Sequence, residues 1–567
     1  MARGRAGLVA ALVACGLLAA LVLPTTAPAA RGLVTGFHAD EYVNTGPPDR
    51  ALWLDRTVNV GGEIARITLG WERVAGSERA PDPRNPGSAS YDFDHIDGGV
   101  RDLKARGVKV LLTVGPDIPL WAEAPGRPAS IDEGRWRPAN PSDFADFVQA
   151  VAARYSGNFD PDGGGPASPL PAVDAVEIWN EPNGEPWLSQ QYGGTPDYYR
   201  AMLNSSYQGV KAVNPGMLVV TGGTGPYGDP PGGPYPPSGG RVRPVEFWQR
   251  VLCVHPTKGK KKKGKKSRRR FARTQGCAAP AMFDVFAHHP IDNTGGGPHR
   301  SGPHKNDAST PDLGRVVRVL RGAERAGTVS PGGRHPVWVT EFWWDSKPPN
   351  RSGAPLAVHA RWIQESLYMF WKAGASVAIN FMLRDQDTRP DVRAGFQAGP
   401  FFNDGRPKPA YTAFRFPFVT ERINERSLRA WGKAPAAGKL VIERKQGNRW
   451  VAVKKLRVRQ GEVFRAKLRL RGAQRVRAKV GREQSLVWKQ AGSGKAAKAS
   501  SDGGPSTATL SLIAVIVFLV AAVLLRGWPL RRRRRAESRR STESRRAESR
   551  RRAERRRRTR GSPDYGS

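Results

Sequence analysis

Cysteine is scarce in this sequence, with 3 among 567 residues. The adjacent histidines His288 and His289 have no cysteine or acidic residue nearby at a zinc-ligand spacing, which argues against a metal site. The basic segments lack interleaved aromatic residues. This disfavours nucleic-acid binding, although a net charge of +41 would otherwise suggest it. We therefore expect no metal ion and no nucleic-acid partner.

Residues 1–30 have the pattern of a secretory signal peptide. Arg3 and Arg5 form a positive start, an apolar run follows from Leu8 to Leu23, and Ala27-Pro28-Ala29 offers a small-residue cleavage site. An alternative is a lipoprotein signal, because Leu12-Val13-Ala14-Cys15 resembles a lipobox. The apolar run continues well past Cys15, so we favour the cleaved signal peptide.

The C-terminal part of the sequence predicts a membrane anchor. Residues 491–506 are rich in small residues and lysine and read as a linker, and 507–526 is an apolar run of spanning length. The arginine-rich segment 527–567 follows at once, and such flanks stay in the cytoplasm. We therefore expect a single-pass plasma-membrane protein with its catalytic part outside, a cytoplasmic basic tail, and lipid contacts through the helix and tail.

Two cysteines, Cys253 and Cys277, remain after the signal peptide. A lone pair in an exported protein usually forms a disulfide, so we expect these two to be joined. The bond would close a loop that carries the basic run 258–270. That run is interpreted as a solvated insertion, with a patch for an anionic polysaccharide or lipid as the alternative.

Two short apolar runs end in a glutamate. Residues Ala175 to Trp179 read as a buried strand that Asn180-Glu181-Pro182 cuts off, because proline ends strand pairing. The run Val337 to Thr340 ends in the same way at Glu341, with aromatic residues directly after it. Carboxylates at the carboxyl ends of buried strands occupy the catalytic positions of a (β/α)8 barrel.

These two motifs, in this order and with strand–helix units between them, resemble the clan A glycoside hydrolases, with families 5 and 39 nearest. The resemblance covers roughly Leu33 to Phe418. It implies a TIM barrel over 31–419, with Glu181 at the end of strand 4 as acid/base and Glu341 at the end of strand 7 as nucleophile. It also implies retaining hydrolysis of O-glycosidic bonds in an extracellular or envelope polysaccharide, without a cofactor.

The resemblance assigns further residues to substrate binding. Asn180 matches the residue that binds the sugar 2-hydroxyl, and Arg66 the strand 2 arginine that supports the nucleophile; an exterior arginine is the alternative. Trp121 resembles a sugar-stacking tryptophan, with a structural role equally open, and Trp343 lies beside the nucleophile. His289 matches a histidine after strand 6.

The sequence also departs from the family pattern. Ile291 stands where the family has a tyrosine, and no tryptophan follows strand 8. These departures motivate an alternative function: a catalytically inactive, membrane-anchored carbohydrate-binding or scaffold protein. Residues 420–490 alternate over short lengths with turn signals between, which predicts a small β-sandwich-like domain that serves as a spacer or binds glycan.

Overall fold

The computed structural model describes residues 29–492, apart from 130, 139, 166–167, 185–186, 190–194, 230–239, 258–269, 278, 293–294 and 388–394. Nearly all of the predicted signal peptide lies outside the described residues. So do most of the predicted linker, the predicted spanning segment 507–526, the basic tail, and nearly all of the basic run 258–270.

The predicted plasma-membrane location requires correction. In the part of the chain that the structure describes, no helix is both long and apolar enough to cross a membrane. The long helices α6 (Thr195–Val213) and α9 (Leu356–Ala373) bury one face and carry charged residues such as Lys211 and Lys372. The predicted contact with membrane lipids loses its support with this correction.

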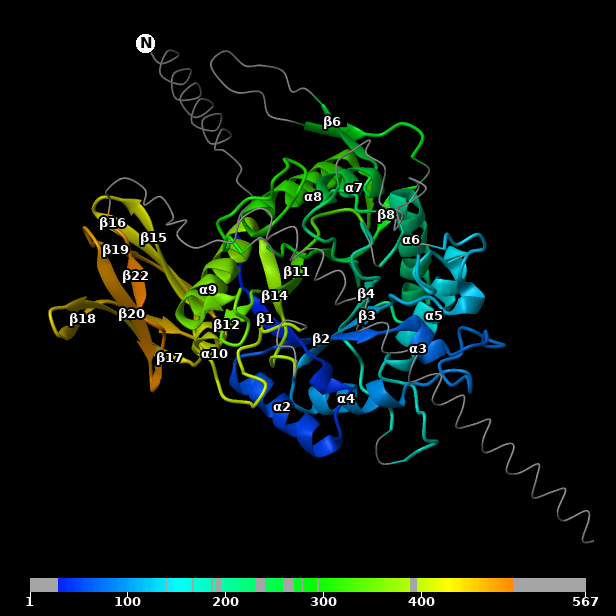
Figure 1. Ribbon diagram of the computed structural model, residues 1–567, viewed down its shortest axis with the longest axis horizontal. Coiled ribbons are helices and arrows are strands. Elements are labelled where there is room, and N and C mark those ends of the chain that lie inside the picture. Colours follow the sequence, from blue (N-terminus) through cyan, green and yellow to red (C-terminus); the bar gives the residue numbers. More distant parts are fainter. Residues whose placement is uncertain are drawn as a thin grey trace, which may run out of the picture. The chain divides into compact units, whose positions relative to one another are not determined.

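Eight parallel strands form the central sheet, in the order β5-β4-β3-β2-β1-β14-β11-β9 (Figure 1). Parallel bridges from Val220 to Val285 and from Thr224 to His288 join the two outer strands and close the sheet into a barrel. The strands are β1 (Val34–His38), β2 (Ile64–Leu69), β3 (Lys109–Val114), β4 (Ala175–Ile178), β5 (Leu218–Thr221), β9 (Phe286–His288), β11 (Val337–Phe342) and β14 (Ala375–Phe381). The predicted (β/α)8 fold is confirmed.

Helices follow the strands around the barrel, because each right-handed crossover must return the chain to start the next parallel strand. Local sequence sets their starts: in α5, Pro141 is the first residue and the Asn140 side chain accepts a hydrogen bond from the Ser142 amide. Besides α6 and α9 they are α2 (Pro47–Asn59), α3 (Trp71–Ala75), α4 (Asp94–Ala105), α5 (Pro141–Arg154), α7 (Pro244–Val251), α8 (Gly314–Ala326) and α10 (Pro409–Arg415).

Inward-facing side chains fill the lower barrel interior. Leu111, Val220, Trp338 and Ile379 belong to one buried apolar cluster contributed by alternate positions of the barrel strands. A second, larger cluster lies between the strands and the surrounding helices and continues into the C-terminal domain. Apolar residues therefore occupy the floor of the barrel, and the polar residues described below lie toward the carboxyl ends of its strands.

The C-terminal domain consists of two antiparallel sheets, which confirms the predicted β-rich domain. One contains β15 (Phe418–Asn424), β16 (Ser427–Lys433) and β19 (Val463–Leu468). The other contains β17 (Gly438–Gln446), β18 (Arg449–Val458), β20 (Gln474–Val480), β21 (Glu483–Gln484) and β22 (Trp488–Gln490). The domain is fixed to the barrel by polar contacts, since Lys433 donates to Thr35 at 2.8 Å and Tyr368 to Glu421 at 2.6 Å.

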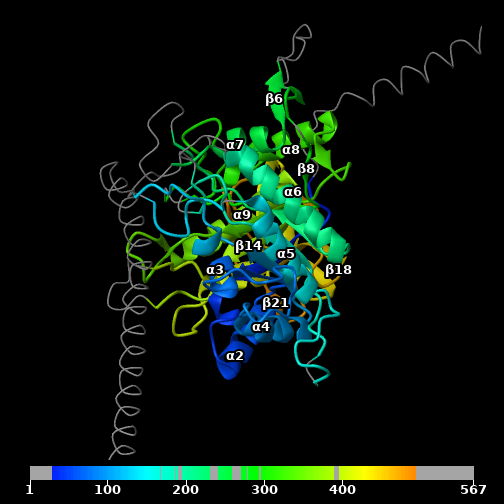
Figure 2. The same cartoon turned by 90° about the vertical axis from the view of Figure 1, so that its right-hand side faces the viewer.

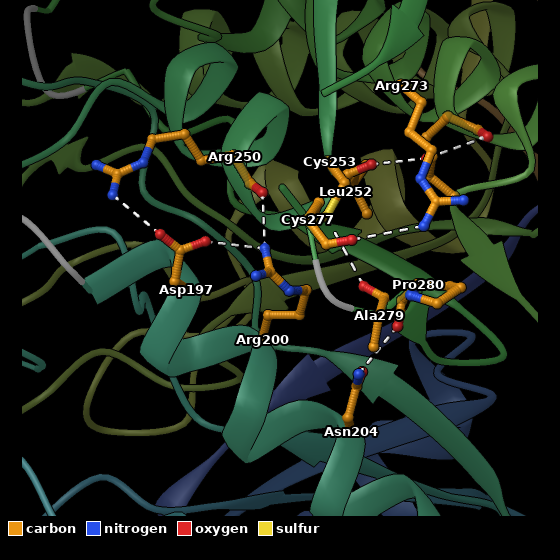
Figure 3. Close-up of a disulfide and its surroundings, with 12 residues drawn as sticks. Asp197, Arg200, Asn204, Arg250, Leu252, Cys253, Arg273, Cys277, Ala279 and Pro280 are labelled. Carbon is orange, nitrogen blue, oxygen red and sulfur yellow. Dashed lines mark hydrogen bonds and ion pairs between the residues drawn. A yellow bond between two sulfur atoms is a disulfide. The ribbon is translucent and has the colours of Figure 1, made fainter. Parts of the chain in front are cut away.

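Sequence reasoning missed a hairpin after α7. Strands β6 (Val254–Thr257) and β7 (Arg270–Arg273) pair antiparallel and project beside α7 and α8 (Figure 2). The predicted disulfide between Cys253 and Cys277 is present at the base of this hairpin, with the Cα atoms 5.9 Å apart (Figure 3). The Thr274 amide donates to the Cys253 carbonyl at 2.8 Å, and Arg273 to the Cys277 carbonyl. Short pairs β8 (Ala281–Met282) with β10 (Val329–Ser330), and β12 (Ser346–Lys347) with β13 (Ala354–Pro355), complete the described strands.

The disulfide should stabilise the fold by restricting the unfolded chain. Replacing both Cys253 and Cys277 by Ser should lower the free energy of unfolding by about 3 kcal/mol on the chain-entropy model. Urea denaturation with and without dithiothreitol measures this effect. Reductant should destabilise the wild type by a similar amount and leave the double variant unchanged; equal stability of all four samples would contradict the prediction.

Candidate active site

Glu181 and Glu341 both lie at the carboxyl end of the barrel. Glu341 is part of β11, and Glu181 follows β4 in a tight turn where Trp179 and Glu181 have positive φ angles of 73° and 41°. Such backbone is strained for residues with a side chain and persists only where surrounding contacts hold it. Here the Glu181 amide donates to the Gly223 carbonyl, and Tyr199 donates to the Ile178 carbonyl, so the turn is fixed from the β5 loop and from α6.

Arg66 of β2 connects the two halves of the site. Its guanidinium donates through Nε to Glu177 at 2.8 Å, through Nη1 to Glu341 at 3.0 Å and through Nη2 to the Asn180 amide oxygen at 2.8 Å. Only 1% of its side chain is exposed, so these contacts replace its hydration. The arginine predicted on strand 2 thus faces the barrel interior and contacts the predicted nucleophile and the predicted sugar-binding amide together.

Glu177 of β4 was missed by sequence reasoning, although a carboxylate inside an otherwise apolar strand was a signal for it. It is fully buried and accepts hydrogen bonds from Arg66, from Thr113 and Thr340 at 2.7 Å each, and from the Gly223 amide at 3.2 Å. Burial opposes its ionisation, but Arg66, His289 and these donors together hold the pKa of Glu177 below its ordinary value. It is therefore an anion beneath the two candidate catalytic carboxyls.

His289 lies between the same groups, directly after β9. Its Nδ1 is 3.0 Å from Glu181 Oε1 and 4.0 Å from Glu341 Oε2, and its Nε2 is 3.0 Å from the Thr340 hydroxyl. The two distances from Nδ1 place those carboxyl oxygens no more than about 7 Å apart. His289 thus lies close to both Glu181 and Glu341, which the sequence predicted at the ends of two separate strands.

The hydrogen bonds that link Glu177, Thr340, His289 and Glu181 require one proton between His289 and Glu181. The Thr340 hydroxyl donates to the Glu177 carboxylate, so its oxygen accepts from His289 Nε2–H. A neutral His289 then presents an unprotonated Nδ1 to Glu181, and their 3.0 Å contact needs a proton supplied by the Glu181 carboxyl or carried by the ring. Either way the Glu181–His289 pair holds a transferable proton that the Arg66–Glu341 pair lacks.

Glu341 has a different electrostatic environment. Burial, only partly offset by His289 and Arg66, raises its pKa above the ordinary value of 4.5, and the neighbouring Glu181 and Glu177 carboxylates raise it further. His38 of β1 completes the polar wall: its Nδ1 lies 3.3 Å from Arg66 Nη1. Burial and the Arg66 charge hold the pKa of His38 well below its ordinary value, so its ring is neutral.

Aromatic residues border the site on two sides. Trp343 packs edge-on against Phe396, which packs in turn against Phe381 at the end of β14. Phe381 also contacts the His38 ring, so a phenylalanine borders the site at the end of strand 8. On the other side, Trp187 donates from Nε1 to Glu181 Oε2 at 3.2 Å, a contact that sequence reasoning missed.

Trp121 is not brought into this network. Its ring packs edge-on against the buried Trp71, with 5.7 Å between centroids. Trp71 also contacts Phe144 and Phe147 of α5, so this cluster anchors α3 and α5 to the barrel. The placement favours the structural role that the sequence left open for Trp121.

The two adjacent histidines make different contacts: His289 contacts Glu181 and Thr340, as described above, and His288 does not share these partners. His288 contacts the Thr224 hydroxyl and, at 2.6 Å, the Ala308 carbonyl, and burial lowers its pKa to about 3. Gly223 must lack a side chain, since a Cβ there would lie 2.2 Å from His289 Nε2. Among the residues that the structure describes, no group of three or more His, Cys, Asp or Glu side chains is placed to hold a metal ion.

Comparison with known proteins found no matching family model and no matching curated protein. Similar solved structures include a family 39 glycoside hydrolase from Bacteroides cellulosilyticus WH2, with a TM-score of 0.47, 17% identity and coverage of 78% of this chain and 81% of that one. A glucosidase from Croceicoccus marinus has a TM-score of 0.43, 14% identity and coverage of 78% and 94%. A GH39 β-xylosidase from Caulobacter crescentus has a TM-score of 0.41, 15% identity and coverage of 79% and 98%. The fold assignment itself rests on the strand order and closure described above.

Removing the Glu177 charge should destabilise the fold, because Arg66 would lose its closest buried counter-ion. We expect Glu177→Gln to lower the free energy of unfolding by about 3 kcal/mol at pH 7. Since the folded pKa of Glu177 lies below its ordinary value of 4.5, its ionised form stabilises the fold above that pH. This contribution is lost as the pH falls through the folded pKa.

Urea denaturation between pH 3 and pH 7 tests this expectation. The difference between wild type and Glu177→Gln should shrink as the pH falls. Asp55→Asn is the matched control, because Asp55 is 62% exposed and its ion pair with Arg106 should contribute less than about 1 kcal/mol. A Glu177→Gln variant as stable as the control would show that Glu177 does not hold Arg66.

Proposed function

We propose that the chain is a retaining glycoside hydrolase in which Glu341 is the nucleophile and Glu181 the acid/base. The observation that carries this proposal is the pairing of each carboxyl with a different partner. Glu341 Oε2 accepts from the permanent cation Arg66, whereas Glu181 Oε1 faces His289 Nδ1 in a contact that needs a proton. The Arg66 charge favours the anionic form of Glu341 that attacks the anomeric carbon, and the contact with His289 favours a group that protonates the leaving oxygen.

The spacing supports the double-displacement course. Carboxyls of retaining enzymes lie roughly 5–5.5 Å apart, which the bound of about 7 Å between Glu181 Oε1 and Glu341 Oε2 accommodates. After Glu341 forms the glycosyl ester, the deprotonated Glu181 removes a proton from water, which then attacks the same carbon. Asn180, whose oxygen is fixed by Arg66, keeps its amide N–H groups for the sugar 2-hydroxyl.

The substrate is proposed to be a polysaccharide or oligosaccharide outside the cell. Trp343 and Phe396 would offer apolar ring surface to the sugar next to the nucleophile, and His289 would orient Glu181. His38 and Asn180, both held by Arg66, would bind sugar hydroxyls. No step requires a cofactor.

Replacing each glutamate should give a distinct chemical signature. Glu341→Gly should lose activity on an aryl glycoside and regain it with azide, which replaces the missing nucleophile and gives a glycosyl azide of inverted configuration. Glu181→Ala should lose about 10²–10⁴-fold in rate on the natural glycan but keep activity on aryl glycosides whose leaving group needs no proton. In that variant azide should give the product of retained configuration.

Product configuration by NMR and rates on a panel of aryl glycosides measure these outcomes. Glu425→Gly, in the exposed turn between β15 and β16, is the matched control and should show neither loss nor azide rescue. Unchanged rates in both Glu341→Gly and Glu181→Ala would contradict the catalytic roles proposed for these two glutamates. That result would favour the alternative of a carbohydrate-binding protein without catalysis.

The raised pKa of Glu341 predicts the acidic limb of the pH profile. Attack requires ionised Glu341, so kcat/KM should fall as the pH decreases through a value above 4.5. Because the Glu177 charge raises that pKa, Glu177→Gln should move the limb to lower pH, whereas Asp55→Asn should not. An aryl glycoside with a good leaving group is the appropriate substrate, since its cleavage does not depend on the Glu181 proton. An unshifted limb in Glu177→Gln would mean that Glu177 does not act on Glu341.

A further inference from the structure

The five-stranded sheet of the C-terminal domain has an outward face on which nearly all of the charged residues are basic. Side chains alternate between the two faces of a strand, and the positions that pair with the buried Leu440, Ile442 and Val476 define the inner face. Strand register then places one set of residues on the outer face. Its ionisable members, apart from Glu443, are Lys439, Lys445, Lys455, Arg457, Arg475, Arg477, Lys479 and Lys489.

These cations form a grid across the sheet. Lys439 pairs with Arg457 on one neighbouring strand, and Val441 pairs with Lys455 and Lys479 on the two sides. Neighbouring strands lie about 4.8 Å apart and same-face residues about 7 Å apart along a strand, so positive groups recur at short, regular intervals. Glu443 is paired with Arg477 at 2.7 Å and neutralises only that residue. Lys439, Lys455 and Arg457 also line a surface hollow at the edge of the sheet.

One aromatic residue lies among the cations. The Arg477 guanidinium covers the Trp450 ring at 4.0 Å from its centroid, so the two side chains hold each other in place. Like charges at such spacing repel one another and lower stability unless a ligand neutralises them. A fold that keeps this repulsion on one uncovered sheet, with a single acidic residue to offset it, is suited to a partner with repeating negative charges.

We propose that this outer face, on β17, β18, β20 and β22, is a binding surface for an anionic polysaccharide. The choice of a polysaccharide rests on the proposed hydrolase function, because the chain that binds the polymer would also carry the barrel that cleaves it. Single-stranded nucleic acid is disfavoured, since it stacks on open aromatic rings and the Trp450 ring is covered by Arg477. A membrane surface is disfavoured too, because binding to a membrane also needs apolar side chains that insert beside the cations. The exposed apolar residue Val451 lies on the opposite face of the sheet, where it pairs with Arg444.

Lysine footprinting tests the proposal residue by residue. The full chain carrying Glu341→Gln is acetylated with and without polygalacturonate at about 0.15 M salt, where weak surface electrostatics are screened. Mass spectrometry should show that Lys439, Lys455 and Lys479 are protected at least about threefold. The exposed Lys109 of β3 and Lys467 of β19 are the internal controls and should react at unchanged rates. Dextran, anionic vesicles and duplex DNA replace polygalacturonate in parallel samples.

Two variants of equal charge then measure the affinity. Lys439→Gln, Lys455→Gln and Lys479→Gln combined should weaken polygalacturonate binding at least about tenfold, since several weak charge contacts add. Lys109→Gln, Arg325→Gln and Lys467→Gln combined is the control and should change binding little. Both variants keep the other basic segments of the chain, so binding of polygalacturonate to those segments contributes equally to the two measurements.

Each outcome is decisive. Equal binding by the two variants, equal protection by dextran, or stronger protection by vesicles or DNA than by polygalacturonate would overturn the proposal. Loss of hydrolysis is a separate result, because the footprint uses an inactive barrel. Protection by polygalacturonate together with wild-type rates on aryl glycosides in both Glu341→Gly and Glu181→Ala would contradict the proposed function and leave the binding surface standing.

Discussion

The site depends on one buried cation. Arg66 holds Glu177, Glu341 and Asn180 with three different nitrogens, and so fixes residues from β4 and β11 relative to β2. A planar guanidinium can do this because its N–H groups point in fixed directions, whereas a lysine would offer a single mobile centre. The cost of burying this charge explains why Glu177 lies beneath the site: without that anion, Glu341 alone would have to balance Arg66.

The two carboxylates that contact the single arginine, Glu177 and Glu341, leave the site with excess negative charge, and this excess separates the roles of the two candidate catalytic groups. Glu341 shares Arg66 with Glu177 and is surrounded by low-dielectric protein, which raises its pKa despite the ion pair. Glu181 contacts His289 and Trp187 instead, and both present N–H or ring nitrogen atoms rather than a permanent charge. Similar side chains can therefore act differently, because their neighbours differ.

The sequence predicted the barrel well because each strand is a short apolar run followed by a polar loop, and this pattern repeats with helices between. The apolar runs beginning at Ala175 and at Val337 were predicted as strands, where β4 and β11 lie, and Glu181 and Glu341 were placed at strand ends by the same logic. Glu177, His38 and Trp187 were missed because their roles depend on contacts between residues far apart in the chain, such as Glu177 with Thr340. For Trp121 the sequence left a sugar-stacking role and a structural role equally open, and its packing against Trp71 favours the structural one.

The basic face illustrates what strand register adds to composition. In the sequence, lysine and arginine are spread through the C-terminal domain, and their alternation with apolar residues indicates only that one side of each strand is solvated. Register aligns Lys455, Val441 and Lys479 across three strands and leaves Glu443 as the one acidic residue on that side. The lysines and arginines that look like ordinary solvated residues in the sequence are thus gathered on one face of the sheet. Because charges within a Debye length act together on a partner, this concentration, and not the net charge of the domain, is the basis for assigning the face a ligand.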